Sequence, residues 1–150
     1  MGIKKMTKEI IDEMFEVLSS NIKIINSNIE ITEKDYLTWK SNILSNKKLR
    51  TIIIKDNILR GYLQYIIIDN EVWICEIQIR DDNKHDKVTL KRLLSQLIKE
   101  SNIGKEIIIY GNINPINKHS IDVFTHIGFI NKENNKYEIN GYKLIKYIDN

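Results

Sequence analysis

At 150 residues, the chain is long enough to bury one hydrophobic core, and its lack of linker-like stretches predicts a single domain over residues 1–150. The hydrophobic fraction of 42% and the charged fraction of 29% are ordinary for a globular protein, and no apolar stretch suits a signal peptide or a membrane span, so we expect a cytoplasmic protein with no membrane partner. The 23 basic residues are spread among 20 acidic ones without a concentrated basic stripe, which argues against a nucleic-acid partner.

The first third of the chain predicts one short strand and two helices. Ile3–Met6 is the candidate strand. Thr7 then has the side chain of an N-cap, and the apolar residues after it recur at helical spacing, which predicts an amphipathic helix from Lys8 to about Ser20. A second helix is predicted to begin at Thr32 and to end in the polar run at residues 46–48.

Three β-rich stretches follow, and turn-forming Asp-Asn pairs separate them. They predict hairpin-connected strands at Thr51–Lys55, Ile58–Ile68 and Glu71–Arg80. The third stretch contains Cys75, the single cysteine of the chain, within an apolar run. This setting predicts a buried core thiol, since a lone cysteine cannot form an internal disulfide and no metal-ligand cluster surrounds it.

The second half of the chain alternates helices with strands, which requires a crossover connection and a mixed sheet. The first predicted helix carries Leu90, Leu93, Leu94, Leu97 and Ile98 on one face and ends near Ser101. The predicted elements after it are a strand at Glu106–Tyr110, a helix at Ile116–Ile127, and strands at Tyr137–Ile139 and Tyr142–Ile148. The last two strands are predicted to pair across Asn140-Gly141, a dipeptide typical of type I′ turns.

The predicted fold class is therefore α/β, with a mixed, mostly antiparallel sheet flanked by helices in the order β-α-α-β-β-β-α-β-α-β-β. One motif within it is unusually informative. From Asn117 to Phe129 the chain reads Asn-Lys-His-Ser-Ile-Asp-Val-Phe-Thr-His-Ile-Gly-Phe, directly after a predicted strand and loop. The spacing resembles the pattern Asn-x-x-Ala-x-x-x-Tyr-x-Lys-x-Gly-Phe of the GNAT superfamily of N-acetyltransferases. The predicted element order is also similar to that of this superfamily over the whole chain.

The resemblance implies acetyl-CoA as the co-substrate. It places Asn117, Ser120 and Phe124 at the acyl-CoA site, and it implies that backbone groups of the strand containing Ile77 and Ile79 hold the pantetheine arm. In the superfamily, a Gln/Arg-x-x-Gly-x-Gly/Ala loop at the start of a helix holds the pyrophosphate. The corresponding residues here are His85, Asp86, Lys87, Val88, Thr89 and Leu90.

The pyrophosphate loop departs from the superfamily pattern, because Val88 and Leu90 stand where small residues allow a phosphate to approach the backbone. Two hypotheses therefore stay open. In the first, the chain is an enzyme that transfers an acetyl group from acetyl-CoA to the primary amine of a small molecule or a peptide by direct attack. In the second, it is a catalytically inactive module of the same fold that holds a ligand or a protein partner.

The transfer needs a base for the amine and an acid for the departing thiolate. Glu76 is the first candidate base, because it interrupts an apolar run where burial would raise its pKa, although a solvated strand face would also explain it. Glu71 is the second candidate. Phe124 occupies the position of the usual acid and has no proton to give, so Tyr110 or the hydroxyl of Ser120 would have to replace it.

Two further expectations concern metals and assembly. His119 and His126 lie two helical turns apart in the motif helix, but no carboxylate pattern accompanies them, so no metal site is predicted. The C-terminal strands could pair across a homodimer.

Overall fold

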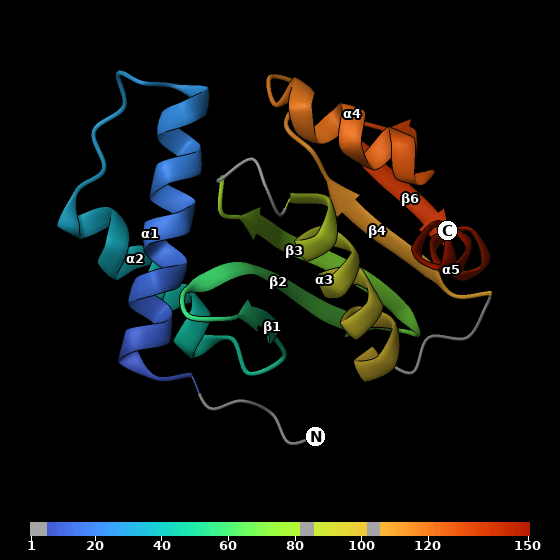
Figure 1. Ribbon diagram of the computed structural model, residues 1–150, viewed down its shortest axis with the longest axis horizontal. Helices are drawn as coiled ribbons and strands as arrows, with labels where there is room; N and C mark the ends of the chain where they lie inside the picture. The colour runs from blue at the N-terminus through green and yellow to red at the C-terminus, as the bar shows by residue number, and fades with distance from the viewer. Residues whose placement is uncertain (1–5, 82–85, 102–105) are drawn as a thin grey trace.

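The computed structural model of the protein describes residues 6–81, 86–101 and 106–150 (Figure 1). Its helices and strands are, in chain order, α1 (Lys8–Ile25), α2 (Glu33–Ser45), β1 (Arg50–Lys55), β2 (Leu59–Ile68), β3 (Glu71–Ile79), α3 (Asp86–Ser101), β4 (Ile108–Asn112), α4 (Lys118–Ile127), β5 (Ile130–Glu133), β6 (Lys136–Asn140) and α5 (Gly141–Asp149). The strand predicted at Ile3–Met6 lies, apart from Met6, outside the described residues.

The described strands form one six-stranded sheet in the order β1-β2-β3-β4-β6-β5. β3 and β4 run parallel, and every other neighbouring pair is antiparallel. The parallel pair requires a crossover, and α3 lies between β3 and β4 in the chain and supplies it. The predicted α/β class, with a mixed and mostly antiparallel sheet, is confirmed.

Two hydrophobic cores lie on opposite faces of the sheet. Along β1, Ile52 and Ile54 belong to the larger core with the leucines of α3, whereas Ile53 packs into the smaller core with α1. This alternation follows from the two-residue period of a strand. The larger core also includes Ile127 of α4 and Leu144 of α5, so α3, α4 and α5 share one face (Figure 1).

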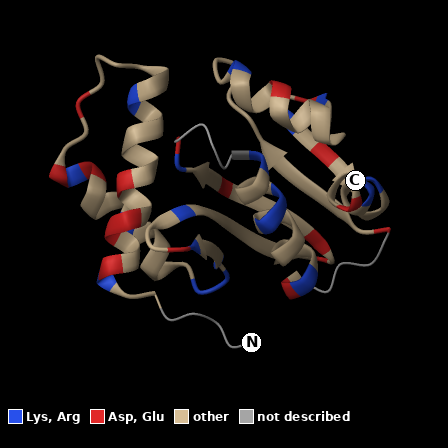
Figure 2. Ribbon diagram, in the orientation of Figure 1, with Lys and Arg blue, Asp and Glu red and all other residues tan. Residues whose placement is uncertain are grey.

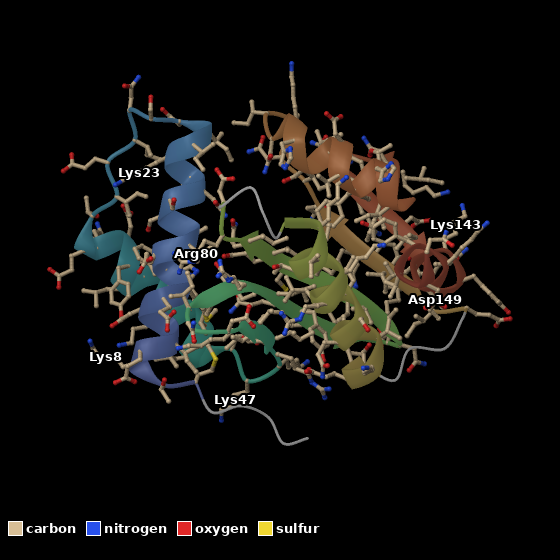
Figure 3. The ribbon with its side chains drawn as sticks, viewed as in Figure 1. Lys8, Lys23, Lys47, Arg80, Lys143 and Asp149 are labelled. Carbon is tan, nitrogen blue, oxygen red and sulfur yellow. The ribbon has the colours of Figure 1, made fainter. Side chains whose placement is uncertain are left out.

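The first half of α1 carries several acidic residues (Figure 2), and the side chains of two of them anchor this helix to the sheet. Glu13 lies 2.5 Å from the ammonium group of Lys55 on β1 and accepts the backbone N–H of Leu59 at 2.9 Å. Glu16 accepts from Arg80, directly after β3, at 2.9 Å. Arg80 reaches toward α1 from the end of its strand (Figure 3), so α1 is held against both β2 and β3.

The predicted starts of α1 and α2 are confirmed, but α1 is longer than predicted, and α4 begins at Lys118 rather than at Ile116. The side chain of Thr7 accepts the N–H of Ile10, and Thr32 forms a capping box with Asp35. α1 continues past Ser20 to Ile25. Asn21 hydrogen-bonds to β3 through its side chain, and this tertiary contact outweighs the modest helix propensity of the Ser-Ser-Asn stretch.

The predicted C-terminal hairpin is wrong. The observed hairpin pairs β5 with β6 across Asn134 and Asn135, which both have positive φ, as a type I′ turn requires. Asn140 instead caps α5, where its side chain accepts the N–H of Lys143 at 2.9 Å. An Asn-Gly pair suits a helix N-cap as well as a turn, and here the burial of Leu144 against α3 favours the helix.

An extra residue in β3 interrupts its pairing with β2. Gln64 of β2 pairs with Glu76. The next residue of β2, Tyr65, pairs with Ile74. Cys75 therefore has no partner across the ladder and forms a β-bulge.

The bulge shifts the alternation of side chains along β3. Ile74 and Ile77 both pack against the larger core, although they lie three residues apart. Cys75 itself is exposed, so the prediction of a buried thiol is wrong. The apolar run in the sequence spans a bulge, and a bulged residue need not share the burial of its neighbours.

The contact between β2 and α3 generates a first prediction. A Cβ added at Gly61 would lie 2.9 Å from the methyl carbon of Thr89 on α3 and 3.0 Å from the carbonyl oxygen of Gln78. Gly61→Ala should therefore lower the free energy of unfolding by about 1–3 kcal/mol, measured by equilibrium urea denaturation. Gly111→Ala is the control, because its Cβ would meet nothing closer than 3.8 Å. Equal stability of the two variants would contradict the close approach of α3.

Candidate functional site

The central feature of the site is a gap between two neighbouring strands. β3 and β4 pair over three residues each, Val72–Ile74 with Ile109–Gly111, and no further pairing between them is described. Beyond this point a cavity of about 180 Å³ lies between residues 74–78 of β3 and residues 111–114 at the end of β4. Asn117, Ser120 and Phe124 of the α4 segment form its third wall.

The edge of β3 beside the cavity presents backbone hydrogen-bonding groups. The N–H of Arg80 donates to the carbonyl of Arg60 at 2.8 Å, so the backbone groups of Arg80 point toward β2. Backbone groups of successive strand residues point to alternate sides, and those of Ile79 and Ile77 therefore point away from β2. In agreement, the carbonyl of Ile79 accepts the side-chain amide of Asn21 at 3.0 Å. Ile77 lines the cavity.

Glu76 lies at the cavity on the opposite face of the strand from Ile77. The hydroxyl of Tyr62, a fully buried residue of β2, donates a hydrogen bond to Glu76 Oε1. Burial raises the pKa of the Glu76 carboxyl, and the hydrogen bond from Tyr62 opposes this increase in part. The same burial and the neighbouring carboxylate raise the pKa of Tyr62, so Tyr62 remains a protonated donor.

The motif segment forms the wall opposite β3. Asn117 caps α4, and its side-chain oxygen accepts the N–H of Ser120 at 3.2 Å. Gly128 ends the helix at φ 126°, a conformation that favours glycine. The ring of Phe124 packs edge-to-face against Phe129, with their centroids 5.1 Å apart. The motif therefore places Asn117, Ser120 and Phe124 along one wall of the cavity.

Tyr110 is not among the described residues that line the cavity. Its ring stacks on Trp73 with a centroid separation of 4.7 Å, and the ammonium group of Lys136 lies 4.1 Å from its centroid. Burial raises the pKa of Tyr110, and Glu71 and Glu138 add to this increase. The structure therefore separates Tyr110 from Glu76 rather than bringing the two together at one site.

Four of the residues predicted to hold the pyrophosphate, Lys87, Val88, Thr89 and Leu90, lie at the start of α3 and are not among the described residues that line the cavity. α3 begins at Asp86, and His85 lies outside the described residues. Lys87 and Val88 are exposed. Thr89 and Leu90 are buried and face the sheet, so neither side chain can reach a ligand in solvent.

Sequence reasoning missed several residues of this region. Cys75, Gln78 and Tyr137 line the cavity, and Tyr62 holds Glu76. The bulge at Cys75 and the register between β2 and β3 place these side chains, and neither can be read from periodicity in a single sequence.

The described residues contain no group of three or more His, Cys, Asp and Glu side chains that could hold a metal ion. No described helix has both the length and the apolar composition needed to cross a bilayer.

No protein-family model and no curated protein matches the sequence. Solved structures do match. The fold is similar to that of PaiA N-acetyltransferase from Thermoplasma acidophilum in complex with coenzyme A, at 19% identity and a TM-score of 0.66 over 93% of this chain and 98% of that one. It is similar to spermidine N-acetyltransferase from Vibrio cholerae in complex with CoA and spermine, at 12% identity and a TM-score of 0.66 over 95% and 96%.

An acetyltransferase of the GNAT family from Staphylococcus aureus Mu50 is similar at 20% identity, with a TM-score of 0.63 over 93% of this chain and 98% of that one. These likenesses show that the chain has the GNAT fold. They confirm the resemblance first seen in the residues from Asn117 to Phe129.

The environment of Glu76 generates a second prediction. The folded protein holds the Glu76 proton more tightly than the unfolded chain, whose carboxyl has a pKa near 4.5. The free energy of unfolding should therefore fall as pH rises from about 4.5 through the raised pKa, by about 1.4 kcal/mol for each tenfold gain in proton affinity.

Glu76→Gln cannot ionise, so its free energy of unfolding should not show this fall with pH. Tyr62→Phe removes the hydrogen bond that favours the carboxylate, so it should raise the pKa of Glu76 further and enlarge the fall. Urea denaturation between about pH 4 and pH 7 measures the effect. A stability difference between Glu76→Gln and the parent that stays constant over this range would refute the raised pKa.

Proposed function

We propose that this chain is an acetyl-CoA-dependent N-acetyltransferase that acts on a primary amine. One observation carries the proposal. The cavity between β3 and β4 brings together a partly buried carboxylate, a strand edge with outward-facing backbone groups and the start of α4. The GNAT fold, and the CoA complexes of PaiA and of the Vibrio cholerae enzyme, support acetyl-CoA as the co-substrate.

The residues at the cavity fit the arm of acetyl-CoA, which when bound supplies the acetyl thioester. The backbone groups of Ile77 and the N–H of Ile79 would hold the pantetheine amides, as a neighbouring strand would. Asn117 Oδ1 is engaged in capping α4, but its Nδ2 group makes no hydrogen bond within the described residues and would donate to the arm. The hydroxyl of Ser120 offers a second donor on the same wall.

The phosphates would lie at the first turn of α3, where backbone N–H groups have no helical partner and the helix dipole favours negative charge. Val88 gives this turn an exposed side chain where glycine would leave the backbone open. Lys87 is exposed there and supplies a positive charge. The fit is therefore stronger at the pantetheine end of the ligand than at the phosphate end.

Glu76 would take the proton from the acceptor amine. A carboxylate with a raised pKa is a stronger base than an ordinary one, and the hydroxyl of Tyr62 holds it in place. Among the described cavity residues, Ser120 and Tyr137 carry hydroxyl groups that could return a proton to the departing thiolate. A free thiol has a pKa of about 8.5, so the thiolate is also a fair leaving group without assistance.

The inactive binding module is the second candidate, and two observations favour it. Phe124 offers no proton at the position of the usual acid, and its ring is packed against Phe129. Thr89 and Leu90 are buried, and no glycine follows Asp86 in the first turn of α3. Such a module could bind a ligand in the cavity but would not catalyse acetyl transfer.

Acetyl-CoA binding provides the first test of the proposal. At about 100 times its Kd, acetyl-CoA should add about 2.7 kcal/mol to the free energy of unfolding, measured as a thermal shift. Ser120→Trp should abolish the shift because Ser120 lines the cavity, whereas His119→Trp should keep it because His119 is exposed on α4. The absence of any shift at millimolar acetyl-CoA would sink the proposal.

Turnover provides the second test. Glu76→Gln should lower kcat by about 10²–10⁴ while keeping the acetyl-CoA thermal shift, because the amide occupies the same space but cannot accept a proton. Glu71→Gln is the matched control from the start of the same strand, outside the cavity, and should keep the parent rate. An undiminished rate in Glu76→Gln would remove Glu76 as the base.

A further inference from the structure

Asn21 links the last turns of α1 to the end of β3. Its Nδ2 atom lies 3.0 Å from the carbonyl oxygen of Ile79 and 2.9 Å from Oε1 of Gln78. The ion pair between Glu16 and Arg80, at 2.9 Å, holds the same two elements together. Asn21 therefore meets β3 at a fixed place rather than as a free surface side chain.

The carbonyl of Ile79 determines the orientation of both side-chain amides. A backbone carbonyl only accepts hydrogen bonds, so the Asn21 atom beside it must be the NH₂ group. That NH₂ group needs an acceptor at its second contact, so the Gln78 atom beside it must be the oxygen. The Nε2 group of Gln78, with two donors, is left without a partner among the described residues.

Gln78 and Glu76 offer complementary groups at one cavity. They lie two residues apart beyond the bulge, so their side chains leave the same face of β3, with Cα atoms about 6.6 Å apart. Both line the cavity. Glu76 presents an acceptor that Tyr62 holds, and Gln78 presents donors that Asn21 orients.

We infer that the acceptor substrate carries a carbonyl or carboxylate oxygen next to its primary amine, as in an amino acid, an amino-acid amide or a peptide N-terminus. The inference rests on the proposed function. The amine would bind at Glu76, and the neighbouring oxygen would accept a hydrogen bond from Gln78 Nε2. A polyamine offers only donors and methylene groups, so it would leave the Gln78 amide unpaired, and sites built to hydrogen-bond a substrate group reject analogues that lack it.

The experiment compares acceptors with the full-length protein and acetyl-CoA. Glycinamide, glycine and glycylglycine represent the three sources of an amine beside a carbonyl, and propylamine and spermine represent amines without one. Acetylated products should be quantified by mass spectrometry, because the exposed thiol of Cys75 would react with reagents that detect released CoA. Rates must be expressed per concentration of unprotonated amine, since the α-amino group of a peptide has a pKa of about 8 and an alkylamine one of about 10.4, and the carboxylate of glycine raises the pKa of its amine above that of a peptide.

The expected result is a kcat/KM for glycinamide at least about tenfold above that for propylamine. Gln78→Met keeps the length of the side chain and removes its donors, so it should reduce this ratio by about tenfold, mainly through KM for glycinamide. Gln96→Met is the matched control. Gln96 bonds to Glu100 on the exposed side of α3, and its replacement should leave the ratio as in the parent.

Two outcomes would overturn the inference and leave the proposed function standing: acetylation of propylamine or spermine as efficient as that of glycinamide, or an unchanged ratio in Gln78→Met. A protein that neither binds acetyl-CoA nor acetylates any of the five amines would overturn the proposed function, and the inference with it. Among the preferred acceptors, a higher rate with glycylglycine than with glycine or glycinamide would assign the site to peptide N-termini.

Discussion

The extra residue in β3 is the constraint on which the site depends. With Cys75 outside the ladder, β3 keeps its pairing with β2 on one side, while its described pairing with β4 ends at Ile74 on the other. The bulge also changes which face each later side chain occupies, so that Ile77 packs into the larger core while Glu76 faces the opposite side. β4 itself ends at Asn112, one residue after its last pairing with β3, so the strand edge beyond Ile74 is left open beside the cavity.

Each half of the molecule contributes one side of this cavity. α1, held to β2 and β3 by its acidic residues and by Asn21, orients Gln78. β2 contributes Tyr62, which holds Glu76. The segment after β4 contributes the cap residue Asn117 and the first turns of α4. In the proposed enzyme, acetyl-CoA would approach from the α4 side and the amine from the side of Glu76, so the thioester and the amine would meet at the gap in the sheet.

The sequence predicted the fold better than it predicted the site. Helical periodicity and two N-caps predicted the first helices, because local patterns determine those elements. The GNAT fold was expected only from the resemblance of the residues from Asn117 to Phe129, and of the element order, to that superfamily. The C-terminal hairpin was misplaced because Asn140 fits both a turn and a helix cap, and only the packing of Leu144 decides between them. Cys75, Tyr62 and Gln78 were missed because a bulge and a cross-strand register are properties of the folded sheet. The burial of Thr89 at the start of α3 could not be predicted either, because it depends on the contact of α3 with Gly61 in the folded protein.

The central claim is that the co-substrate binds at the strand edge beside the bulge. Residue-resolved amide exchange tests this claim most directly. In the free protein, the N–H groups of Ile77 and Ile79 should exchange rapidly, while those of Glu76 and Gln78 should be protected by β2. Saturating acetyl-CoA should protect Ile77 and Ile79 and leave the other two unchanged. Exchange at Ile77 and Ile79 that is the same with and without acetyl-CoA would contradict the account.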